Sequence, residues 1–472
     1  MDKHLEHKNK TKRISSLIKK YSLATKQGQL NFYHKSTNST RPNNKQDQLI
    51  DISDLNEIIE INVKEKYVLV EPNVSMEKLV AATVKYNLIP PVVMEFPKIT
   101  CGGAVNGASL ESSSFKYGQL SDTCEEYEII LGNGKIIRAS KKINSDLFYG
   151  ISGSYGTLGF ISLLKIKLLK AKKYVKLNYY PTGSFKETIE LIKTKATENK
   201  NDYIDAIIYD KSHGVVMTGK NTDSENLPIK SYSKISEPWF HRRVKLITRR
   251  KQPQEELIPL ADYCFRYDRG AYWMGEFAFP LLGVPDNKLT RFIFNDYAKT
   301  HKLFEALQTL NVSQNYFVQD IYLPFNKTLN SLKYNEQNEK IYPVWLCPIK
   351  ATDKEQKLSP HYIKDKLLID IGIYGQTNKY LLDPIKSNRK LEAFAKRNGG
   401  RKMLYAHAYY TENEFWSIYN KDWYNKLRIK YHAQNVFPDV WKKTHVSGHI
   451  KGTRWCGFFK YFFINPIKRL IQ

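Results

Sequence analysis

The chain has 472 residues, 42% of them hydrophobic, which is enough for two or three globular domains with cores of their own. Its formal net charge is +27, and such an excess of cations is typical of proteins that meet nucleic acid or an anionic membrane. A solvated Lys-rich surface explains the same charge. No helix-turn-helix, zinc-finger or RNP motif occurs, so nucleic acid is the least favoured partner.

The cysteines are five and scattered, and no C-x-x-C pair occurs among Cys101, Cys124, Cys264, Cys347 and Cys456. They predict neither a disulfide framework nor a zinc site, and we expect no metal and a reducing, cytoplasmic compartment. The N-terminus has no apolar run of signal-peptide length, and no window holds 18 uninterrupted apolar residues. We therefore expect neither a signal peptide nor a transmembrane helix.

The chain opens with a basic segment over residues 1–25, in which Ile14, Leu17, Ile18 and Tyr21 recur at helical spacing. It predicts a helix, either the first helix of a domain or one that docks on a surface. A polar, turn-rich stretch follows over residues 30–48. Next we expect a short strand and a helix over 49–59, a strand over 67–70, and a helix that Ser75 caps.

Two glycine-rich segments then bracket a hairpin between residues 99 and 161. The first runs from Thr100 to Gly107, and the second covers residues 153–160. Asn133-Gly134 predicts the tight turn between strands 126–131 and 135–139. Glycines allow close approach, and bare N–H groups can hold a pyrophosphate, so a cofactor wrapped by main chain is indicated. Ordinary tight turns explain the spacing equally, and neither a Rossmann nor a P-loop motif is present.

After a strand over 161–169, residues 171–173 mark a domain boundary. A strand, a helix and two strands follow over 175–220, which predicts an α+β domain with an antiparallel sheet. Further strands are expected over 315–324, 342–348, 367–374 and 403–410, and a helix over 387–398. The aromatic-rich stretch 260–279 predicts either a wall of an apolar substrate pocket or core.

The tail over residues 451–472 combines Trp455, several Phe and Tyr, and five Lys or Arg with no acidic residue. This composition suits an anchor at a membrane interface, and packing on its own domain is the alternative. A basic aromatic segment around Trp239 and Phe240 leaves the same two choices open. We therefore expect a cytoplasmic protein, with peripheral contact to an anionic membrane left open.

Several short sequence motifs of this chain occur in the same order in a known family. They lie at residues 100–103, 107, 111–118, 144–149, 156–160, 237–240, 318–320, 342–348, 369–375 and 404–406. The chain resembles the vanillyl-alcohol-oxidase (PCMH-type) superfamily of FAD-linked oxidoreductases and, within it, the delta(24)-sterol reductases. The resemblance runs from about residue 30 to about residue 445.

The resemblance implies an α+β fold with four parts. They are a two-subdomain PCMH-type FAD-binding domain over 1–171, an α+β substrate (cap) domain with an antiparallel sheet over 172–400, a segment over 401–450 that returns to the flavin site, and the basic aromatic tail over 451–472. FAD is expected to bind noncovalently. Its predicted contacts are Thr100, Cys101, Gly102, Gly103, Ala104, Asn106, Gly107, Ser112, Ser113, Gly118, Gly156, Thr157, Gly159 and Ile161.

In the family a glycine loop near residues 30–48 contacts the FAD pyrophosphate through backbone N–H groups. This chain has no glycine there, and the side chains over residues 36–41 offer hydroxyls and the Arg41 guanidinium instead, groups that also bind phosphate. A plain solvent loop is the alternative.

The resemblance also implies a reaction. NADPH would reduce FAD, flavin N5 would pass a hydride to a C=C bond of a sterol-like or other lipid substrate, and a protein acid would protonate the other carbon. The candidates for acid or orienting residue are Asp320, Tyr405 and His407, although the sterol-reductase pattern has an acidic residue where His407 stands. A surface carboxylate and a buried structural histidine are the alternatives for Asp320 and His407.

Two other functions stay open. One is an FAD-dependent oxidase or dehydrogenase of an alcohol, polyol or lipid-linked sugar, as elsewhere in the superfamily. The other is a basic, membrane- or nucleic-acid-associated protein on a flavin fold that has lost its cofactor. The colour of the protein and its response to NADPH would separate the three.

Overall fold

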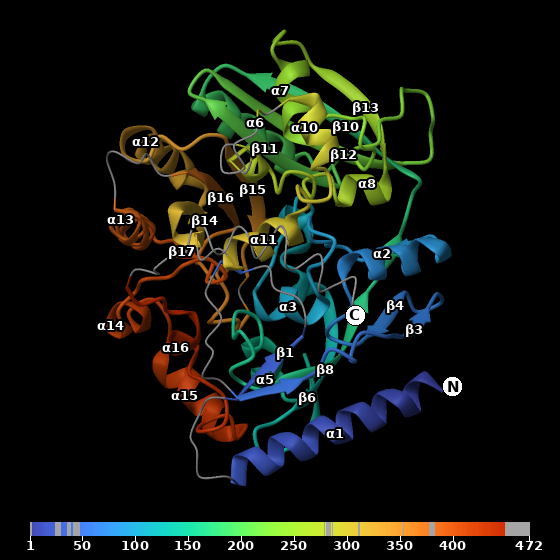
Figure 1. Ribbon diagram of the computed structural model, residues 1–472, viewed down its shortest axis with the longest axis vertical. Coiled ribbons are helices and arrows are strands. Elements are labelled where there is room, and N and C mark those ends of the chain that lie inside the picture. The colour runs from blue at the N-terminus through green and yellow to red at the C-terminus, as the bar shows by residue number, and fades with distance from the viewer. Residues whose placement is uncertain are drawn as a thin grey trace.

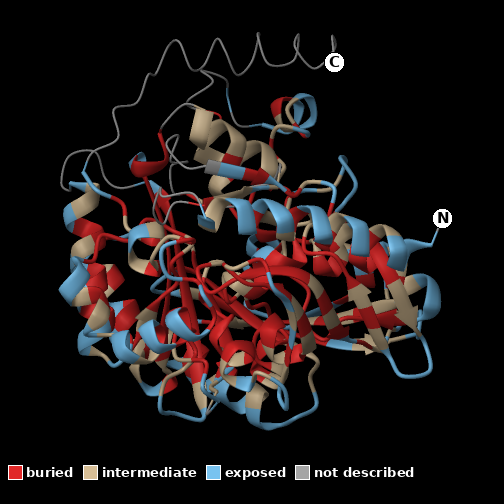
Figure 2. Cartoon of the chain, turned by 90° about the horizontal axis from the view of Figure 1, so that it is seen from below, coloured by how far each residue is buried: buried red, intermediate tan, exposed pale blue. Residues whose placement is uncertain are grey.

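The structure is a computed structural model that describes residues 2–23, 30–34, 39–40, 48–277, 279, 285, 287–309, 312–352, 354–376 and 383–448. It contains an eight-stranded and a five-stranded sheet, which lie toward opposite ends of the long axis (Figure 1). The predicted α+β class is confirmed. Buried residues gather in the strands at the middle of the molecule, and exposed residues lie on the outer helices and turns (Figure 2).

The five-stranded sheet has the order β3-β4-β8-β6-β7 and is antiparallel throughout. Asn133-Gly134 forms the predicted hairpin turn, with Gly134 at φ +82°, where a glycine is favoured. The strands are β3 (Ile58–Asn62), β4 (Tyr67–Val70), β6 (Cys124–Ile130), β7 (Ile136–Ser140) and β8 (Phe160–Lys167). Two small sheets accompany it, β1 (Leu30–Tyr33) with β2 (Gln48–Asp51), and β5 (Leu88–Ile89) with β9 (Leu169–Lys170).

Short helices surround this sheet, and the helix expected within 49–59 does not form. There the backbone bonds to side chains instead, because Ser53 N–H donates to Asp51 and Glu57 N–H donates to Glu71. Ser75 caps α2 as predicted, by accepting a bond from Lys78 N–H. The helices are α1 (Lys3–Leu23), α2 (Met76–Thr83), η1 (Val84–Tyr86), α3 (Cys101–Asn106), α4 (Ser114–Tyr117), η2 (Leu120–Thr123) and α5 (Ser145–Gly150).

The eight-stranded sheet has the order β13-β10-β12-β11-β15-β16-β14-β17, and every neighbouring pair is antiparallel. The antiparallel sheet predicted for the second half of the chain is therefore present, and it extends to Lys402. Its strands are β10 (Tyr174–Thr182), β11 (Tyr203–Asp210), β12 (His213–Thr222), β13 (Gln254–Pro259), β14 (Tyr316–Pro324), β15 (Val344–Lys350), β16 (Leu367–Gln376) and β17 (Arg401–Lys402).

Side-chain alternation gives this sheet two apolar faces. On β14, Phe317 and Ile321 pack with α6 (Phe185–Thr197), α12 (Thr328–Asn338) and α13 (Pro384–Arg397), whereas Val318 and Tyr322 join the main core shared with the five-stranded sheet. Other helices of this half are α7 (Phe240–Thr248), α8 (Leu260–Cys264), η3 (Met274–Phe277), α10 (Lys288–Ile293), α11 (Thr300–Thr309), η4 (Ser313–Asn315) and η5 (Phe325–Lys327).

The C-terminal segment runs back along both sheets through α14 (Glu412–Trp416), α15 (Lys421–Lys430) and α16 (Val440–Thr444) (Figure 1). The strand predicted over 403–410 is wrong: only Ala408 makes an isolated bridge, to His445. Side chains take the backbone bonds here, because Tyr409 N–H donates to Glu392 and the Lys402 ammonium donates to the backbone carbonyl of residue 407. The tail over 451–472 lies outside the described residues.

Across the ranges that the structure describes, no helix is both long and apolar enough to cross a bilayer. In the same ranges no group of three or more His, Cys, Asp or Glu is placed to hold a metal ion.

Candidate active site

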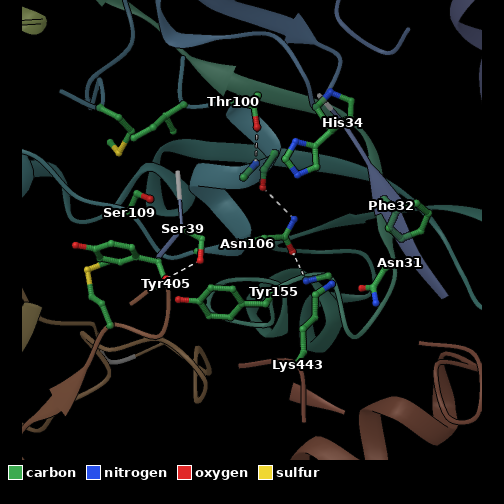
Figure 3. Close-up of a pocket in the computed structure, with 18 of the residues that line it drawn as sticks. Asn31, Phe32, His34, Ser39, Thr100, Asn106, Ser109, Tyr155, Tyr405 and Lys443 are labelled. Atoms are coloured by element: carbon green, nitrogen blue, oxygen red, sulfur yellow. Dashed lines mark hydrogen bonds between the residues drawn. The ribbon is translucent and has the colours of Figure 1, made fainter. Parts of the chain in front are cut away.

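A cavity of about 1280 Å³ lies between the two sheets, and the C-terminal segment completes its wall (Figure 3). Cavities of about 300–1,000 Å³ hold one drug-sized ligand, so this volume has room for a large cofactor together with a substrate. The two ends of the cavity differ in chemistry. One is lined by glycines and cations, and the other by carboxyl groups and apolar side chains.

The glycine end is built on the start of α3. Thr100 caps this helix, because its hydroxyl accepts a bond from Gly103 N–H at 3.2 Å. Gly102 packs so closely on Pro72 that an added Cβ would lie 2.6 Å from the proline Cβ. Both glycines therefore expose bare backbone along the cavity wall.

Asn106 joins the two glycine segments (Figure 3). Its amide donates to the Gly102 carbonyl at 2.9 Å, and its Oδ1 accepts from Gly156 N–H at 2.9 Å. The backbone carbonyl of Asn106 also accepts from Tyr155 N–H at 3.2 Å. Gly156 has φ +75°, which favours a glycine, and one asparagine thus holds the two turns in register.

The predicted cofactor contacts divide into two groups. The cavity is lined by Thr100, Gly102, Gly103, Asn106, Gly107, Gly156, Gly159 and Ile161. It is not lined by Cys101, Ala104, Ser112, Ser113, Gly118 or Thr157. For the second group, direct contact with a cofactor stays a prediction that their positions do not support.

The second group has structural partners instead. The Ser113 hydroxyl donates to the Pro91 carbonyl at 2.8 Å, and the Ser112 carbonyl accepts from Ile204 N–H, which ties this turn to β11. The Thr157 hydroxyl donates to the Ser154 carbonyl at 2.7 Å. Gly118 has φ +76°, and a Cβ there would overlap the Asp122 carboxylate. In the structure these residues therefore hold the loops together.

Cations from the C-terminal segment line the glycine end, and sequence reasoning missed them. The Lys443 ammonium is the nearest atom to the side-chain position of Gly156, 3.9 Å from an added Cβ. Lys442 also lines the cavity. Burial, reinforced by the charge of Lys443, lowers the pKa of His34, so this imidazole is neutral at pH 7.

Arg428 lines the same end but serves the fold. Its guanidinium donates to the backbone carbonyls of residues 157, 433, 437 and 438 and to the Tyr424 hydroxyl. The loop over residues 36–41 is described only at Ser39 and Thr40. Ser39 lines the cavity and donates to the Tyr405 carbonyl at 2.7 Å, whereas Thr40 is buried and does not line it. The other predicted phosphate contacts lie outside the described residues.

At the other end, Asp320 accepts bonds from two phenols. The Tyr405 hydroxyl donates to Asp320 Oδ2 at 2.5 Å, and the Tyr374 hydroxyl donates to Oδ1. Burial raises the pKa of Asp320 to about 6, although both phenols lower it. Asp320, which is 3% exposed, is therefore not a surface carboxylate. The structure thus brings two of the candidate residues, Asp320 and Tyr405, into contact, and their catalytic roles stay predictions.

Two further carboxyl groups line this end, and sequence reasoning missed both. Asp370 lies on the Asp320 face of the sheet, because Asp320 pairs with Gly372 and residues two apart share a face. Burial raises its pKa well above the usual range, with the charge of Asp320 adding to the effect. Burial likewise raises the pKa of Glu95 to about 8, so Glu95 is protonated at pH 7. An acidic residue inside an otherwise apolar strand was the available signal for Asp370.

His407 does not reach the cavity. It is 1% exposed, its Nε2 lies 3.3 Å from the Ser313 hydroxyl, and its carbonyl accepts from Gln319 at 3.3 Å. The expected alternation with Tyr405 fails because residues 403–410 form no strand. Its position favours the structural alternative over a role as proton donor.

The remaining wall near Asp320 is apolar. Tyr272 and Trp345 contact each other with tilted rings, 5.3 Å between ring centroids, and α11 adds Leu303, Phe304 and Leu307. The aromatic stretch 260–279 is thus divided, since Tyr272 and Met274 line the cavity whereas Trp273 is buried in the core.

A buried ion network holds this wall. The Arg266 guanidinium lies 2.8 Å from Asp205 of β11 and 3.3 Å from Glu111 at the α4 turn. Trp345 Nε1–H donates to the same Asp205 oxygen at 3.1 Å, and Tyr267 donates to it at 2.7 Å. The network therefore connects β11 of the eight-stranded sheet to the loop before α4, next to Trp345 of the cavity wall.

The residues present fit a flavin dinucleotide. Bare glycine backbone and the Lys443 ammonium meet the requirements of a pyrophosphate, and the volume leaves room for a second molecule beside it. Comparison with known proteins agrees, because residues 15–140 match the family model described as an FAD binding domain.

Delta(24)-sterol reductases from animals and plants match along most of the chain. Delta(24)-sterol reductase from Homo sapiens is 32% identical over 397 residues, which cover 82% of this chain and 76% of the human protein. The Arabidopsis thaliana protein of that name is 29% identical over 432 residues, with coverages of 84% and 76%. Cytokinin dehydrogenase 9 from Oryza sativa subsp. japonica is 29% identical over only 152 residues, which cover 32% of this chain and 29% of that protein.

The fold, the site and these matches define the chain as an FAD-dependent oxidoreductase of the PCMH type. Within that class, it belongs to the delta(24)-sterol reductase family.

Proposed function

We propose that this protein reduces a carbon–carbon double bond of a sterol-like or other lipid substrate. The observation that carries the proposal is the single cavity that joins a glycine-lined end to an apolar end holding Asp320. The delta(24)-sterol reductases that match along most of the chain support a sterol as the substrate class. We also propose that the protein is cytoplasmic, with peripheral contact to an anionic membrane.

The glycine end would hold the cofactor. Thr100, Gly103 and Gly156 present backbone, Asn106 keeps the two turns in register, and Lys443 places a cation beside them. FAD bound there would supply hydride transfer, with NADPH as the proposed electron donor.

The carboxyl end would supply the proton. Asp320 with a pKa of about 6 is partly protonated near neutral pH, and Tyr405 and Tyr374 hold its two oxygens in fixed positions. Burial by the apolar wall around it raises the pKa and so increases the protonated fraction of the acid. Asp320 is therefore the proposed proton donor, and Tyr405 and Tyr374 are positioning residues.

The visible spectrum of the purified protein, recorded before and after anaerobic NADPH, tests the proposal. A flavin spectrum that NADPH bleaches, with reoxidation by a sterol that carries a side-chain double bond, is the expected result. Bleaching by an alcohol or a sugar but not by NADPH would instead favour an oxidase or dehydrogenase. A colourless protein that does not take up FAD would contradict the proposal.

A further inference from the structure

The short helix α10 presents its apolar side to solvent. Leu289, Phe292 and Ile293 are 66%, 61% and 60% exposed, and the spacing of three and four residues places them on one face. Thr290, in contrast, is buried against the protein and closes a capping box with Asn287. The amphipathic pattern of this helix is therefore inverted relative to that of a helix packed on a core.

A strongly basic helix lies beside it. Residues 240–251, which contain α7, hold six Lys or Arg and no Asp or Glu. Trp239 at the start of α7 packs with Ala298, and Phe294 at the end of α10 packs against the same cluster. Both helices lie at the end of the molecule opposite α1 (Figure 1).

On this side of the molecule, the basic residues outnumber the acidic residues that pair with them. Arg242 pairs with Glu276, and Arg243 lies 3.5 Å from Glu256. Residues 249–251 (Arg, Arg and Lys) are exposed on the chain that follows α7. Near α10 the one exposed acid among the described residues 287–299 is Asp296, which already pairs with Lys299 at 2.8 Å. A partner with an anionic surface and an apolar interior would match both the basic residues and the exposed apolar side chains of α10.

α11 connects this surface to the cavity. It follows α10 after six residues and lines the cavity with Leu303, Phe304 and Leu307. A partner that receives the three exposed α10 side chains would therefore lie close to α11, which forms part of the apolar wall at the carboxyl end of the cavity.

We propose that the surface formed by Leu289, Phe292 and Ile293 of α10, with the cations of residues 242–251, docks on an anionic lipid membrane. The three side chains insert among the acyl chains, and the basic residues face the lipid headgroups. This inference rests on the peripheral membrane contact proposed above and deepens it by naming the surface that makes the contact; it does not depend on which bond the protein reduces.

Binding to vesicles tests the proposal with the full chain. Co-sedimentation is measured with phosphatidylcholine vesicles and with vesicles that also contain phosphatidylserine. We expect the triple variant L289S/F292S/I293S to bind the mixed vesicles at least about tenfold more weakly than the wild type. The variant R249S/R250S should lose about fivefold for each cation, and only on the mixed vesicles.

A matched control removes three exposed apolar residues elsewhere, L5S/I143S/I429S, whose exposures are 55%, 54% and 63%. It should bind like the wild type. All variants keep residues 449–472, so any binding through the tail is common to them. Circular dichroism checks the fold, and F292S alone replaces the triple variant if the latter does not fold.

Three results would overturn the proposal. They are a wild type that binds neither vesicle, a triple variant that binds as well as the wild type, and a triple variant that changes the oligomeric state without vesicles. The last result would assign the α10 face to a second copy of the chain. Vesicle binding needs no turnover, so a failure here and a failure of the proposed function are distinguishable.

Discussion

At the scale of single residues, the site depends on a few polar side chains whose partners come from distant parts of the chain. Asn106 bonds to both glycine segments, and Asp320 accepts from phenols of β16 and of the C-terminal segment. In both cases one side chain fixes the position of others, so single substitutions should have specific and separable effects.

The pH dependence of turnover should report the protonation of Asp320. As a proton donor Asp320 must be protonated, so turnover should fall as the pH rises above about 6. The Tyr405 hydrogen bond lowers this pKa, and Y405F should therefore move the falling limb to higher pH. D320N should lower turnover by about 10²- to 10⁴-fold.

The control for this prediction is H407N, because His407 does not line the cavity. The turnover of H407N should fall with rising pH over the same range as that of the wild type. NADPH should still bleach the flavin of D320N, because the acid acts after the flavin is reduced. If turnover in Y405F falls at the same pH as in the wild type, Asp320 is not the proton donor.

FAD affinity should depend on Asn106. N106A removes the side-chain bond to Gly156, which joins the two glycine turns, and the bond to the Gly102 carbonyl within the first turn, and we expect FAD to bind about tenfold more weakly. S113A is the matched comparison, because the Ser113 hydroxyl bonds to Pro91 and not to the cavity. Fluorescence of released FAD measures both affinities. Equal losses in the two variants would show that loop structure, and not contact at the site, sets the affinity.

At the scale of elements, a buried histidine is one of the contacts that attach α1 to the five-stranded sheet. His7 lies 3.0 Å from Glu71 and 3.2 Å from Glu128 of β6. Burial alone would lower the pKa of His7, but the bonds to Glu128 and Glu71 raise it to about 9. The basic helix that the sequence predicts is thus part of the domain, with Ile14 and Ile18 fully buried.

The stability of this attachment should depend on pH. Because the folded pKa exceeds the unfolded value, the stabilisation is fully present below about pH 6.5 and is lost as the pH rises through about 9. We expect a loss of roughly 2–3 kcal/mol between pH 6 and pH 10 that H7Q does not show. Urea unfolding at both pH values measures it, and an equal loss in H7Q would contradict the prediction.

At the scale of the whole molecule, the two sheets meet across buried charges as well as across the apolar core. Arg266 contacts Asp205 on one side of the junction and Glu111 on the other. The aromatic rings of Tyr263 and Tyr267 lie 4.1 and 4.6 Å from its guanidinium. The relative position of the glycine end and the carboxyl end should therefore depend on this network.

Removing Arg266 should destabilise the protein strongly. R266M leaves two buried carboxylates without their cation, and we expect a loss of about 3–5 kcal/mol. The triple variant R266M/E111Q/D205N removes the charges together and should recover part of that loss. Guanidinium unfolding measures all three proteins. If R266M unfolds at the same guanidinium concentration as the wild type, the network contributes little to the stability of the protein.

The sequence was sufficient where structure depends on neighbours in the chain. The Asn133-Gly134 turn, the Ser75 cap and the strand–helix–strand–strand order after residue 173 follow from turn chemistry, capping and alternation, which act over a few residues. The motifs shared with the family added the FAD domain, and they singled out Asp320 and Tyr405 as candidates, which the structure brings into contact. The predicted helix within 49–59 and the strand over 403–410 failed because distant carboxylates, Glu71 and Glu392, take the backbone N–H groups.

The composition of the cavity depended on contacts between residues far apart in the chain. Lys443 reaches Gly156, Asp370 joins Asp320 across two paired strands, and Glu95 completes the carboxyl end, and no local pattern places these side chains together. For the same reason Ser112, Ser113 and Thr157 turned out to support the loops and not to line the cavity. Local propensity is encoded residue by residue, whereas a cavity exists only after both sheets and the returning C-terminal segment have packed against each other.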